Sequence, residues 1–240
     1  MDISKFTRPA RKLLPLKPCG AVIVAAGTAS RMKGIDKIMA PLKGEPLIRR
    51  TVRNFQECDA ISEIVIVTRE DLIRPITDAC RDLPKVTAVV AGGNSRQESV
   101  HLGLNALSEQ VKLAAVHDGA RPLVTWQLID RVVRAANTYG AAAPAIPVKD
   151  TVKVVRGGVV ESTPDRSALR AVQTPQVFDF DLLRGALKKA EADGAQVTDD
   201  CSAVERMGMS VKIVEGDERN LKVTTPLDLK IAELLLEETV

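Results

Sequence analysis

The sequence predicts an α/β fold: a Rossmann-like sandwich with a mostly parallel central sheet and a protruding β-arm. Short apolar runs alternate with helix-like amphipathic stretches along most of the 240 residues, of which 45% are hydrophobic. Continuous apolar strands with helices between them are typical of parallel sheets that helices cover on both faces. One later segment breaks this alternation and predicts the arm.

Five apolar runs have the length and composition of buried strands. They are VIVAA (22–26), EIVIV (63–67), VTAVV (86–90), LAAV (113–116) and AAAPAIPV (141–148). Because each run is followed by an amphipathic stretch, we expect the strands to be joined by crossover helices.

Two helix starts are marked by their capping residues. Ser95 with Glu98 fits a capping box ahead of an amphipathic stretch. Thr225 and Pro226, followed by Asp228, fit an N-cap, a first-turn proline and an early acid. We therefore expect helices to begin near residues 96 and 226.

The predicted arm follows Pro147. The segment KDTVKVVRGGVVESTPDR contains two β-rich runs on either side of Gly157 and Gly158. A Gly-Gly pair between β-branched runs favours a hairpin, and a hairpin with polar residues on both faces buries little by itself. We expect residues 148–166 to form an arm that reaches over a neighbouring subunit of a homodimer.

Length and charge predict one main domain. A chain of this size is long enough for one sizeable core, which we expect over residues 19–240. Of the 34 basic and 31 acidic residues, residues 1–18 hold five basic and one acidic, which predicts a basic N-terminal extension. The remainder carries 29 basic and 30 acidic residues, a net charge of −1. This balance gives no broad positive field for nucleic acid.

The remaining composition disfavours several classes of protein. No apolar run approaches the roughly 20 residues that span a bilayer. The four cysteines are far apart and form no C-x-x-C pair, so structural zinc and a disulfide framework are disfavoured. We expect a soluble, cytoplasmic protein that has no protein-ligated metal and binds neither membranes nor nucleic acid.

The first apolar run leads into a loop of small residues that ends in a cation. Arg31 closes the stretch GTASR, and Lys37 follows six positions later. Small residues let a triphosphate approach backbone N–H groups, and cations neutralise its charge, although a tight turn without a ligand is the alternative. The chain has neither G-x-G-x-x-G here nor a G-x-x-x-x-G-K-[ST] loop, which disfavours hydride transfer and P-loop ATP hydrolysis.

The stretch AAGTASRM followed by DKIMAPLKGEPLI resembles the signature of nucleotidyltransferases with an A-A-G-x-G-x-R-M loop and a nearby lysine. The later segments match the order and spacing of the 2-C-methyl-D-erythritol 4-phosphate cytidylyltransferase family, and the resemblance covers residues 20–236. These segments are GGNSRQESVHLGL, VHDGARP, KDTVK, LRAVQTPQVF, VTDDCSAVE and LKVTTPLDL.

The resemblance implies transfer of CMP from CTP to 2-C-methyl-D-erythritol 4-phosphate, with release of pyrophosphate, in isoprenoid precursor synthesis. It also implies Mg²⁺ that is bound mainly through the CTP phosphates, and a homodimer. Two other functions stay open: a ribitol 5-phosphate cytidylyltransferase, which shares the fold and chemistry, and a non-catalytic nucleotide-binding protein.

The resemblance also assigns site residues by position. The catalytic cations are Arg31, Lys37 and Lys222. The nucleotide-binding residues are Ala25, Ala26, Gly27, Gly93, Asn94, Ser99 and Asp118. The acceptor-binding residues are Arg121, Thr174 and Thr198 of the main body with Thr151 and Arg166 of the partner's arm.

Four residues depart from the family pattern. Ala29 replaces a second glycine, Asp36 stands where many members have proline, and Gly119 and Cys201 each replace an alanine. None of them removes a charged contact. We expect these departures to affect the choice of acceptor more than the class of reaction.

Overall fold

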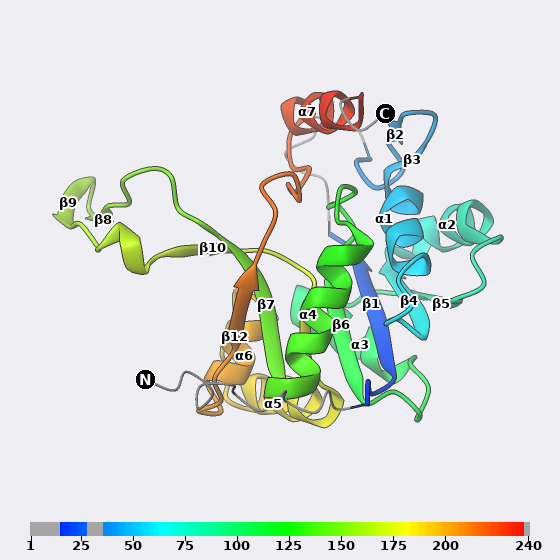
Figure 1. Ribbon diagram of the computed structural model, residues 1–240, viewed down its shortest axis with the longest axis horizontal. Coiled ribbons are helices and arrows are strands. Elements are labelled where there is room, and N and C mark those ends of the chain that lie inside the picture. Colours follow the sequence, from blue (N-terminus) through cyan, green and yellow to red (C-terminus); the bar gives the residue numbers. More distant parts are fainter. Residues whose placement is uncertain (1–14, 28–35, 238–240) are drawn as a thin grey trace, which may run out of the picture.

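The computed structural model describes residues 15–27 and 36–237. Eight strands form its main sheet: β1 (Cys19–Ala25), β4 (Glu63–Thr68), β5 (Val86–Ala91), β6 (Leu113–Asp118), β7 (Ala141–Pro147), β10 (Arg170–Val172), β11 (Gln176–Asp179) and β12 (Lys212–Glu215). Their order is β10-β7-β11-β6-β1-β4-β5, and β12 pairs with β7 (Figure 1).

The sheet is mostly parallel, as the sequence predicts. β1 pairs in parallel with β4 and β6, β4 with β5, and β12 with β7, whereas β10 and β11 run antiparallel to their neighbours. Each of the five predicted apolar runs forms a strand. Every residue of β4 and β6 is buried, which explains why these strands are continuously apolar rather than alternating.

Helices cover both faces of this sheet. They are α1 (Leu47–Gln56), α2 (Ile73–Cys80), α3 (Arg96–Asn105), α4 (Trp126–Tyr139), α5 (Phe180–Ala192), α6 (Asp200–Glu205) and α7 (Pro226–Glu237). Ala21 and Ile23 of β1 pack in one core cluster with α1, α2 and α4, while Val22 packs in the other with α3, α5 and α6. The Rossmann-like sandwich is thereby confirmed.

The shorter elements lie outside the main sheet. They are β2 (Pro41–Leu42), β3 (Glu45–Pro46), the 3-10 helices Glu70–Leu72 and Arg166–Ala168, β8 (Val154–Arg156) and β9 (Val159–Ser162). α7 contributes Ala232 to a third, smaller cluster that also contains Leu42 and Val223. Among the described helices, none is both long and apolar enough to cross a membrane.

The two helix caps differ in detail. The Thr225 hydroxyl accepts the N–H of Asp228 (3.3 Å), as the predicted N-cap requires, and the Asp228 carboxylate also accepts the N–H of Thr225 (2.8 Å). At α3 the Ser95 hydroxyl accepts the N–H of Glu98 (3.0 Å), but the Glu98 carboxylate accepts the N–H of Asn94 (2.6 Å). The expected return bond therefore lies one residue earlier and secures the loop that precedes the helix.

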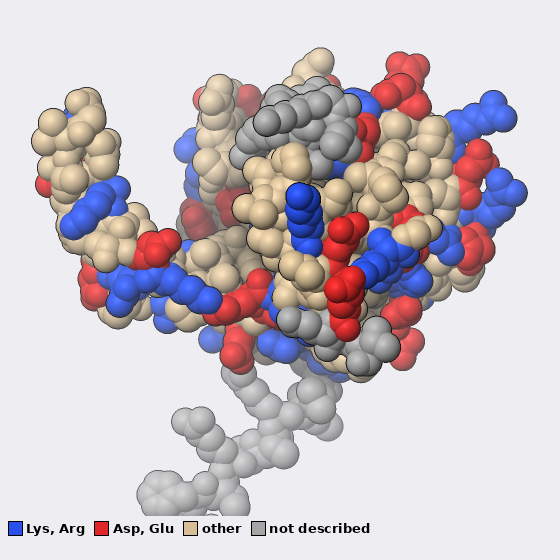
Figure 2. Space-filling view, turned by 90° about the horizontal axis from the view of Figure 1, so that it is seen from above, with Lys and Arg blue, Asp and Glu red and all other residues tan. Residues whose placement is uncertain are grey.

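The predicted arm is a hairpin that leaves the body between β7 and β10 (Figure 1). Gly157 and Gly158 join β8 to β9, and both have a positive φ (57° and 80°), which glycine adopts without the Cβ clash of other residues. Figure 2 shows the arm as a separate lobe with a largely uncharged tip. Its exposed apolar side chains include those of Val154, Val155, Val159 and Val160.

His117, in β6, is a core residue rather than an exposed base. Its ring is fully buried, and its centroid lies 4.8 Å from that of Phe55. Nε2 lies 3.4 Å from the carbonyl oxygen of Arg121, which can only accept, so Nε2 carries the hydrogen and Nδ1 accepts from the Thr174 hydroxyl (3.0 Å). Burial disfavours the imidazolium and lowers the pKa of His117 to about 3.

This depressed pKa predicts acid-sensitive stability. The unfolded chain binds a proton at His117 below its ordinary pKa of about 6.5, whereas the folded chain does so only near pH 3, so stability is complete above pH 6.5 and falls as the pH drops toward 3. Urea unfolding should show that His117 contributes a loss of about 2 kcal/mol between pH 7.5 and pH 5.

His117→Gln should remove this part of the pH dependence even if it lowers stability at every pH. Equal slopes for the parent and His117→Gln would contradict the assignment.

Candidate active site

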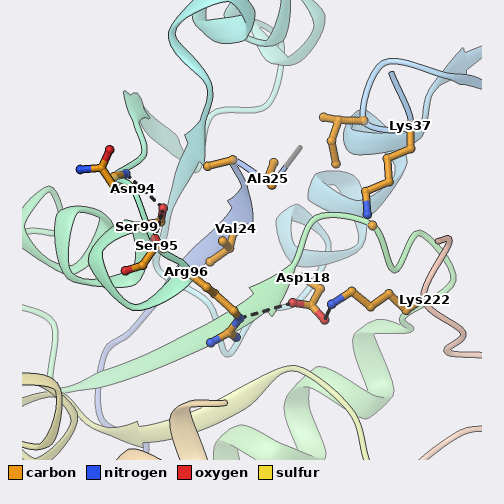
Figure 3. Close-up of a pocket in the computed structure, with 14 residues that line it drawn as sticks. Val24, Ala25, Lys37, Asn94, Ser95, Arg96, Ser99, Asp118 and Lys222 are labelled. Carbon is orange, nitrogen blue, oxygen red and sulfur yellow. Dashed lines mark hydrogen bonds and ion pairs between the residues drawn. The ribbon is translucent and has the colours of Figure 1, made fainter. Parts of the chain in front are cut away.

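A cavity of about 480 Å³ opens at the carboxyl ends of β1 and β6, where α/β folds commonly bind ligands (Figure 3). Residues from widely separated segments of the chain line it. They include the predicted residues Ala25, Ala26, Gly27, Lys37, Gly93, Asn94, Ser99, Asp118 and Lys222. The fold thus brings the predicted nucleotide-binding residues together with two of the three predicted catalytic cations.

The other predicted residues are placed differently. Arg31 lies outside the described residues. Thr151 and Arg166 are exposed on the arm, and Arg166 donates to the carbonyl oxygen of Lys149 (2.8 Å). Thr198 is exposed just before α6. The contacts of these residues with an acceptor therefore stay predictions.

The loop between β5 and α3 is packed closely against β1. A Cβ at Gly92 would lie 2.4 Å from the Cβ of Ala26, so glycine is required for this approach. The buried Ser99 hydroxyl accepts the N–H of Gly93 (3.1 Å) and donates to the carbonyl oxygen of Ser95 (2.8 Å). Because a hydroxyl has one hydrogen, which Ser99 donates to Ser95, this side chain fixes the shape of the loop.

Asp118, at the end of β6, is surrounded by cations (Figure 3). Its Oδ2 lies 3.0 Å from Lys222 Nζ and 3.4 Å from Arg121 Nε, and its Oδ1 lies 3.9 Å from Arg96 Nε. Burial alone would raise the pKa of Asp118, but Lys222, Arg96 and Arg121 outweigh burial and lower the pKa to about 2. The carboxylate is therefore charged at neutral pH.

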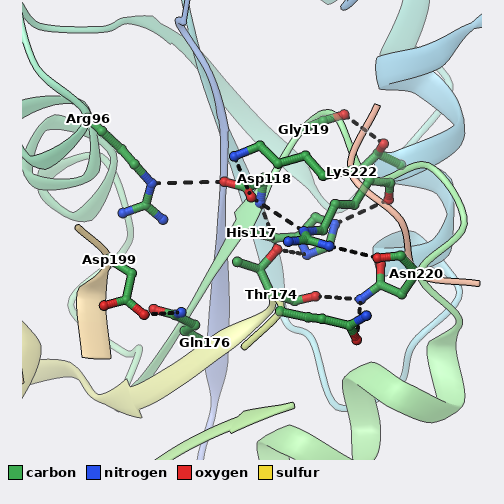
Figure 4. Close-up of polar contacts among 12 residues, drawn as sticks. Arg96, His117, Asp118, Gly119, Thr174, Gln176, Asp199, Asn220 and Lys222 are labelled. Carbon is green, nitrogen blue, oxygen red and sulfur yellow. Dashed lines mark hydrogen bonds and ion pairs between the residues drawn. The ribbon is translucent and has the colours of Figure 1, made fainter. Parts of the chain in front are cut away.

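Arg96 is a cavity residue that the sequence analysis missed. Its Nη2 pairs with Oδ2 of Asp200 (2.7 Å), a carboxylate that is 1% exposed. Gln176 accepts the N–H of Asp200 (3.0 Å) and donates to the carboxylate of Asp199 (2.8 Å), as Figure 4 shows for the latter contact. Arg96 thus links the start of α3, at the cavity, to the segment that carries Thr198.

Arg121 and Thr174 contact Asp118 but are not among the described residues that line the cavity. Arg121 Nη1 donates to the carbonyl oxygen of Asn220 (2.7 Å), and Asn220 Nδ2 donates to that of Thr174 (2.9 Å). The Thr174 hydroxyl accepts the N–H of Asp118 (3.1 Å). These contacts fix the end of β6 and the segment before Lys222, so both residues support Asp118 whether or not they touch an acceptor.

The side chains that line the cavity suit a metal ion that is bound mainly by a substrate better than a metal ion that is bound mainly by the protein. Asp118 is the only carboxylate in the described cavity lining. Within the described ranges, no group of three or more His, Cys, Asp or Glu side chains is arranged to hold a metal. Mg²⁺ commonly takes one or two carboxylates together with substrate phosphates and water.

Taken together, the geometry suits anionic phosphates. Lys37, Lys222 and Arg96 line the cavity together with small residues at the end of β1 and in the loop before α3. The described lining contains no serine, cysteine or lysine paired with a histidine, as nucleophilic catalysis would require. The cavity can therefore act by positioning and charge stabilisation.

Comparison with known proteins agrees with this geometry. The family model for 2-C-methyl-D-erythritol 4-phosphate cytidylyltransferase matches residues 19–238. The chain is 48% identical to the enzyme of that name from Symbiobacterium thermophilum over 223 residues, covering 92% of this chain and 94% of the relative. It is 43% identical to the one from Caldanaerobacter subterraneus subsp. tengcongensis, covering 91% and 98%.

Solved structures give the same result. The 4-diphosphocytidyl-2C-methyl-D-erythritol synthase from Anaerococcus prevotii superposes with a TM-score of 0.83 at 31% identity, covering 92% of this chain and 96% of that one. The 2-C-methyl-D-erythritol 4-phosphate cytidylyltransferase from Thermus thermophilus superposes with a TM-score of 0.75 at 34% identity, covering 90% and 98%. The chain belongs to the 2-C-methyl-D-erythritol 4-phosphate cytidylyltransferase family.

Proposed function

We propose that this protein transfers CMP from CTP to 2-C-methyl-D-erythritol 4-phosphate and releases pyrophosphate. The observation that carries the proposal is the cavity that Lys37, Lys222 and Asp118 line together with the small residues Ala25, Ala26 and Gly27, in a chain of this family. Ribitol 5-phosphate transfer and non-catalytic nucleotide binding are less well supported, because the relatives compared above carry the methylerythritol phosphate name over more than 90% of their length.

In the proposed reaction, a phosphate oxygen of the acceptor attacks the α-phosphorus of CTP. A new P–O bond forms, the bond to the bridging oxygen breaks, and pyrophosphate leaves with that electron pair. A phosphate monoester has a second pKa of about 6, so the nucleophile is largely dianionic at neutral pH and needs no strong general base. The buried, neutral His117 is not required as one.

The cations perform most of the proposed catalysis. Arg31 and Lys37 bind the triphosphate, and Lys222 binds the α-phosphate and the incoming phosphate. Lys222 Nζ already lies 3.0 Å from the Asp118 carboxylate. Part of the conformational entropy of the Lys222 side chain is therefore lost before substrate binds. Removing one such contact in a related reaction type commonly costs on the order of 10²–10³ in rate.

For the nucleotide, we propose that the backbone of Ala25, Ala26 and Gly27 contacts the CTP phosphates and ribose. Gly93 and Asn94 face the cytosine edge, and Ser99 holds their loop in place. A base is distinguished by the donors and acceptors on its edge, so backbone and amide groups suit this task better than charges. Mg²⁺ bound to the CTP phosphates would neutralise part of their charge, and Asp118, the carboxylate of the described cavity lining, would contact its water shell.

For the acceptor, we propose a site shared between two subunits. Thr151 and Arg166 of the partner's arm complete it beside Thr198, with Arg121 and Thr174 behind. The arm projects away from its own body, and its exposed valines would be covered in a homodimer (Figure 2).

We also propose that residues 19–240 act as one domain that follows a basic extension at 1–18. The reaction is proposed to take place in the cytoplasm, because the four cysteines are buried and unpaired, which suits a reducing compartment.

The proposed function predicts strict substrate dependence. Pyrophosphate release by the purified protein should require CTP, Mg²⁺ and 2-C-methyl-D-erythritol 4-phosphate together, and chelation with EDTA should abolish it. Ribitol 5-phosphate should support little turnover. UTP should be at least about 100-fold poorer than CTP in kcat/KM, because it differs at the edge being read. Equal turnover with ribitol 5-phosphate would reassign the acceptor, and equal turnover with UTP would remove the base-reading role of Gly93 and Asn94.

The shared acceptor site predicts complementation between inactive variants. Arg166→Ala removes the arm contact and Lys222→Ala removes the body contact. In a random mixture, about half of the dimers are mixed and each restores one site of two, so activity should recover to about a quarter of the parental value. A mixture of Lys222→Ala with the Arg166→Ala, Lys222→Ala double variant should stay inactive. If subunits exchange and no activity returns, each subunit builds its own site.

A further inference from the structure

Asp36 makes two kinds of contact immediately before Lys37. Its Oδ1 accepts the backbone N–H groups of Ile38 (2.9 Å) and Met39 (3.3 Å). Its Oδ2 pairs with the guanidinium of Arg69. One carboxylate therefore closes the local turn around Lys37 and also ties it to a segment 33 residues away.

Arg69 is itself fixed at the edge of the sheet. It follows the last residue of β4, and its Nε and Nη2 lie 3.0 and 3.1 Å from the two carboxylate oxygens of Asp71. Two parallel bonds of this kind orient the planar guanidinium as well as attract it. Asp36 is thus paired with a cation that does not depend on Asp36 for its own placement.

The chain on the other side of Lys37 is anchored to α1. The carbonyl oxygen of Ile38 accepts the N–H of Ile48 (3.0 Å), and that of Ala40 accepts the N–H of Leu47 (2.9 Å). The Ile38 side chain is buried in the main core cluster. The backbone at Lys37 is therefore held between α1 on one side and the Asp36–Arg69 ion pair on the other.

We propose that the Asp36–Arg69 ion pair is a positioning device that holds the backbone of Lys37 so that its ammonium group reaches the CTP triphosphate. The proposal rests on the proposed function, because it deepens the role given there to Lys37. Neither Asp36 nor Arg69 lines the cavity, whereas Lys37 does, so the pair acts through Lys37 and not on substrate.

Two physical arguments favour this role over a merely structural one. Both side chains of the pair are 28% exposed, and ion pairs with that much contact with water add little to stability. A lysine side chain is long and flexible, so its reach depends on where its backbone is held, and a misplacement of 1 Å can cost about 10²-fold in rate. The pair should therefore matter more for turnover than for folding.

The first test compares three variants of the full chain. Arg69→Gln and Asp36→Asn should each lower kcat on the order of tenfold, with the KM of the acceptor changed less than about twofold. Asp36→Asn keeps an oxygen that can accept from Ile38, so it isolates the ion pair from the turn. Arg81→Gln, which removes an exposed ion pair with Asp78 (2.8 Å), keeps the Asp36–Arg69 pair and is the matched control, with parental kcat. Melting temperatures should stay within about 4 °C of the parent.

The second test asks whether the effect passes through Lys37. In a Lys37→Ala background, Arg69→Gln should lower kcat by less than about twofold further, because the group being positioned is gone. A full tenfold loss in that background, or parental kcat for Arg69→Gln alone, would overturn the proposal.

Chemical labelling of Lys37 separates this inference from the proposed function. In the parent, CTP should protect the Lys37 amine from an acylating reagent, as measured by mass spectrometry, and Arg69→Gln should weaken that protection while Arg81→Gln does not. Protection that is equal in Arg69→Gln and the parent would refute the role of the ion pair and leave Lys37 as a triphosphate contact. No protection in the parent would refute the contact of Lys37 itself.

Discussion

The cavity depends on one carboxylate that holds three cations in place. Asp118 lies at the end of a fully buried strand, Arg121 follows it by three residues, and Lys222 and Arg96 reach it from two other segments of the chain. Without that negative charge, the same three groups would repel one another within a small volume. With the Asp118 charge in place, the three cations are ordered before any phosphate binds. The site then needs less rearrangement of its charged groups when the transition state forms.

The fold supplies the rigid frame for this carboxylate. The parallel pairing of β1 with β6 and β4, and of β4 with β5, brings the ends of these strands to one edge, where residues that follow β1, β5 and β6 line the cavity. Behind the edge, the Thr174 hydroxyl bonds to the His117 ring and accepts the N–H of Asp118, and the Asn220 amide donates to the carbonyl oxygen of Thr174. The arm contributes nothing to this wall from its own subunit, which is why the acceptor side is proposed to need a partner.

The sequence predicted most of this because the strands and the motif-bearing loops are local patterns. The apolar runs, the Gly157–Gly158 hairpin and the residues of the cavity wall could all be read from short stretches. What it could not predict are pairs that join distant segments, such as Arg96 with Asp200, 104 residues apart. The sequence shows Arg96 as a cation within the segment GGNSRQES, but no neighbouring residue indicates which carboxylate it pairs with. The sequence likewise could not show that the Ser99 hydroxyl forms a hydrogen bond with the backbone of its own loop.

The most direct test of this account is a carboxyl ¹³C NMR titration of Asp118 in the absence of substrate. The account predicts a pKa near 2, so the Asp118 signal should stay constant between pH 7 and pH 4, and Lys222→Ala should raise the pKa because it removes the strongest opposing cation. An ordinary pKa of about 3.9 in the parent, or a pKa that Lys222→Ala leaves unchanged, would contradict the claim that these cations are held by Asp118.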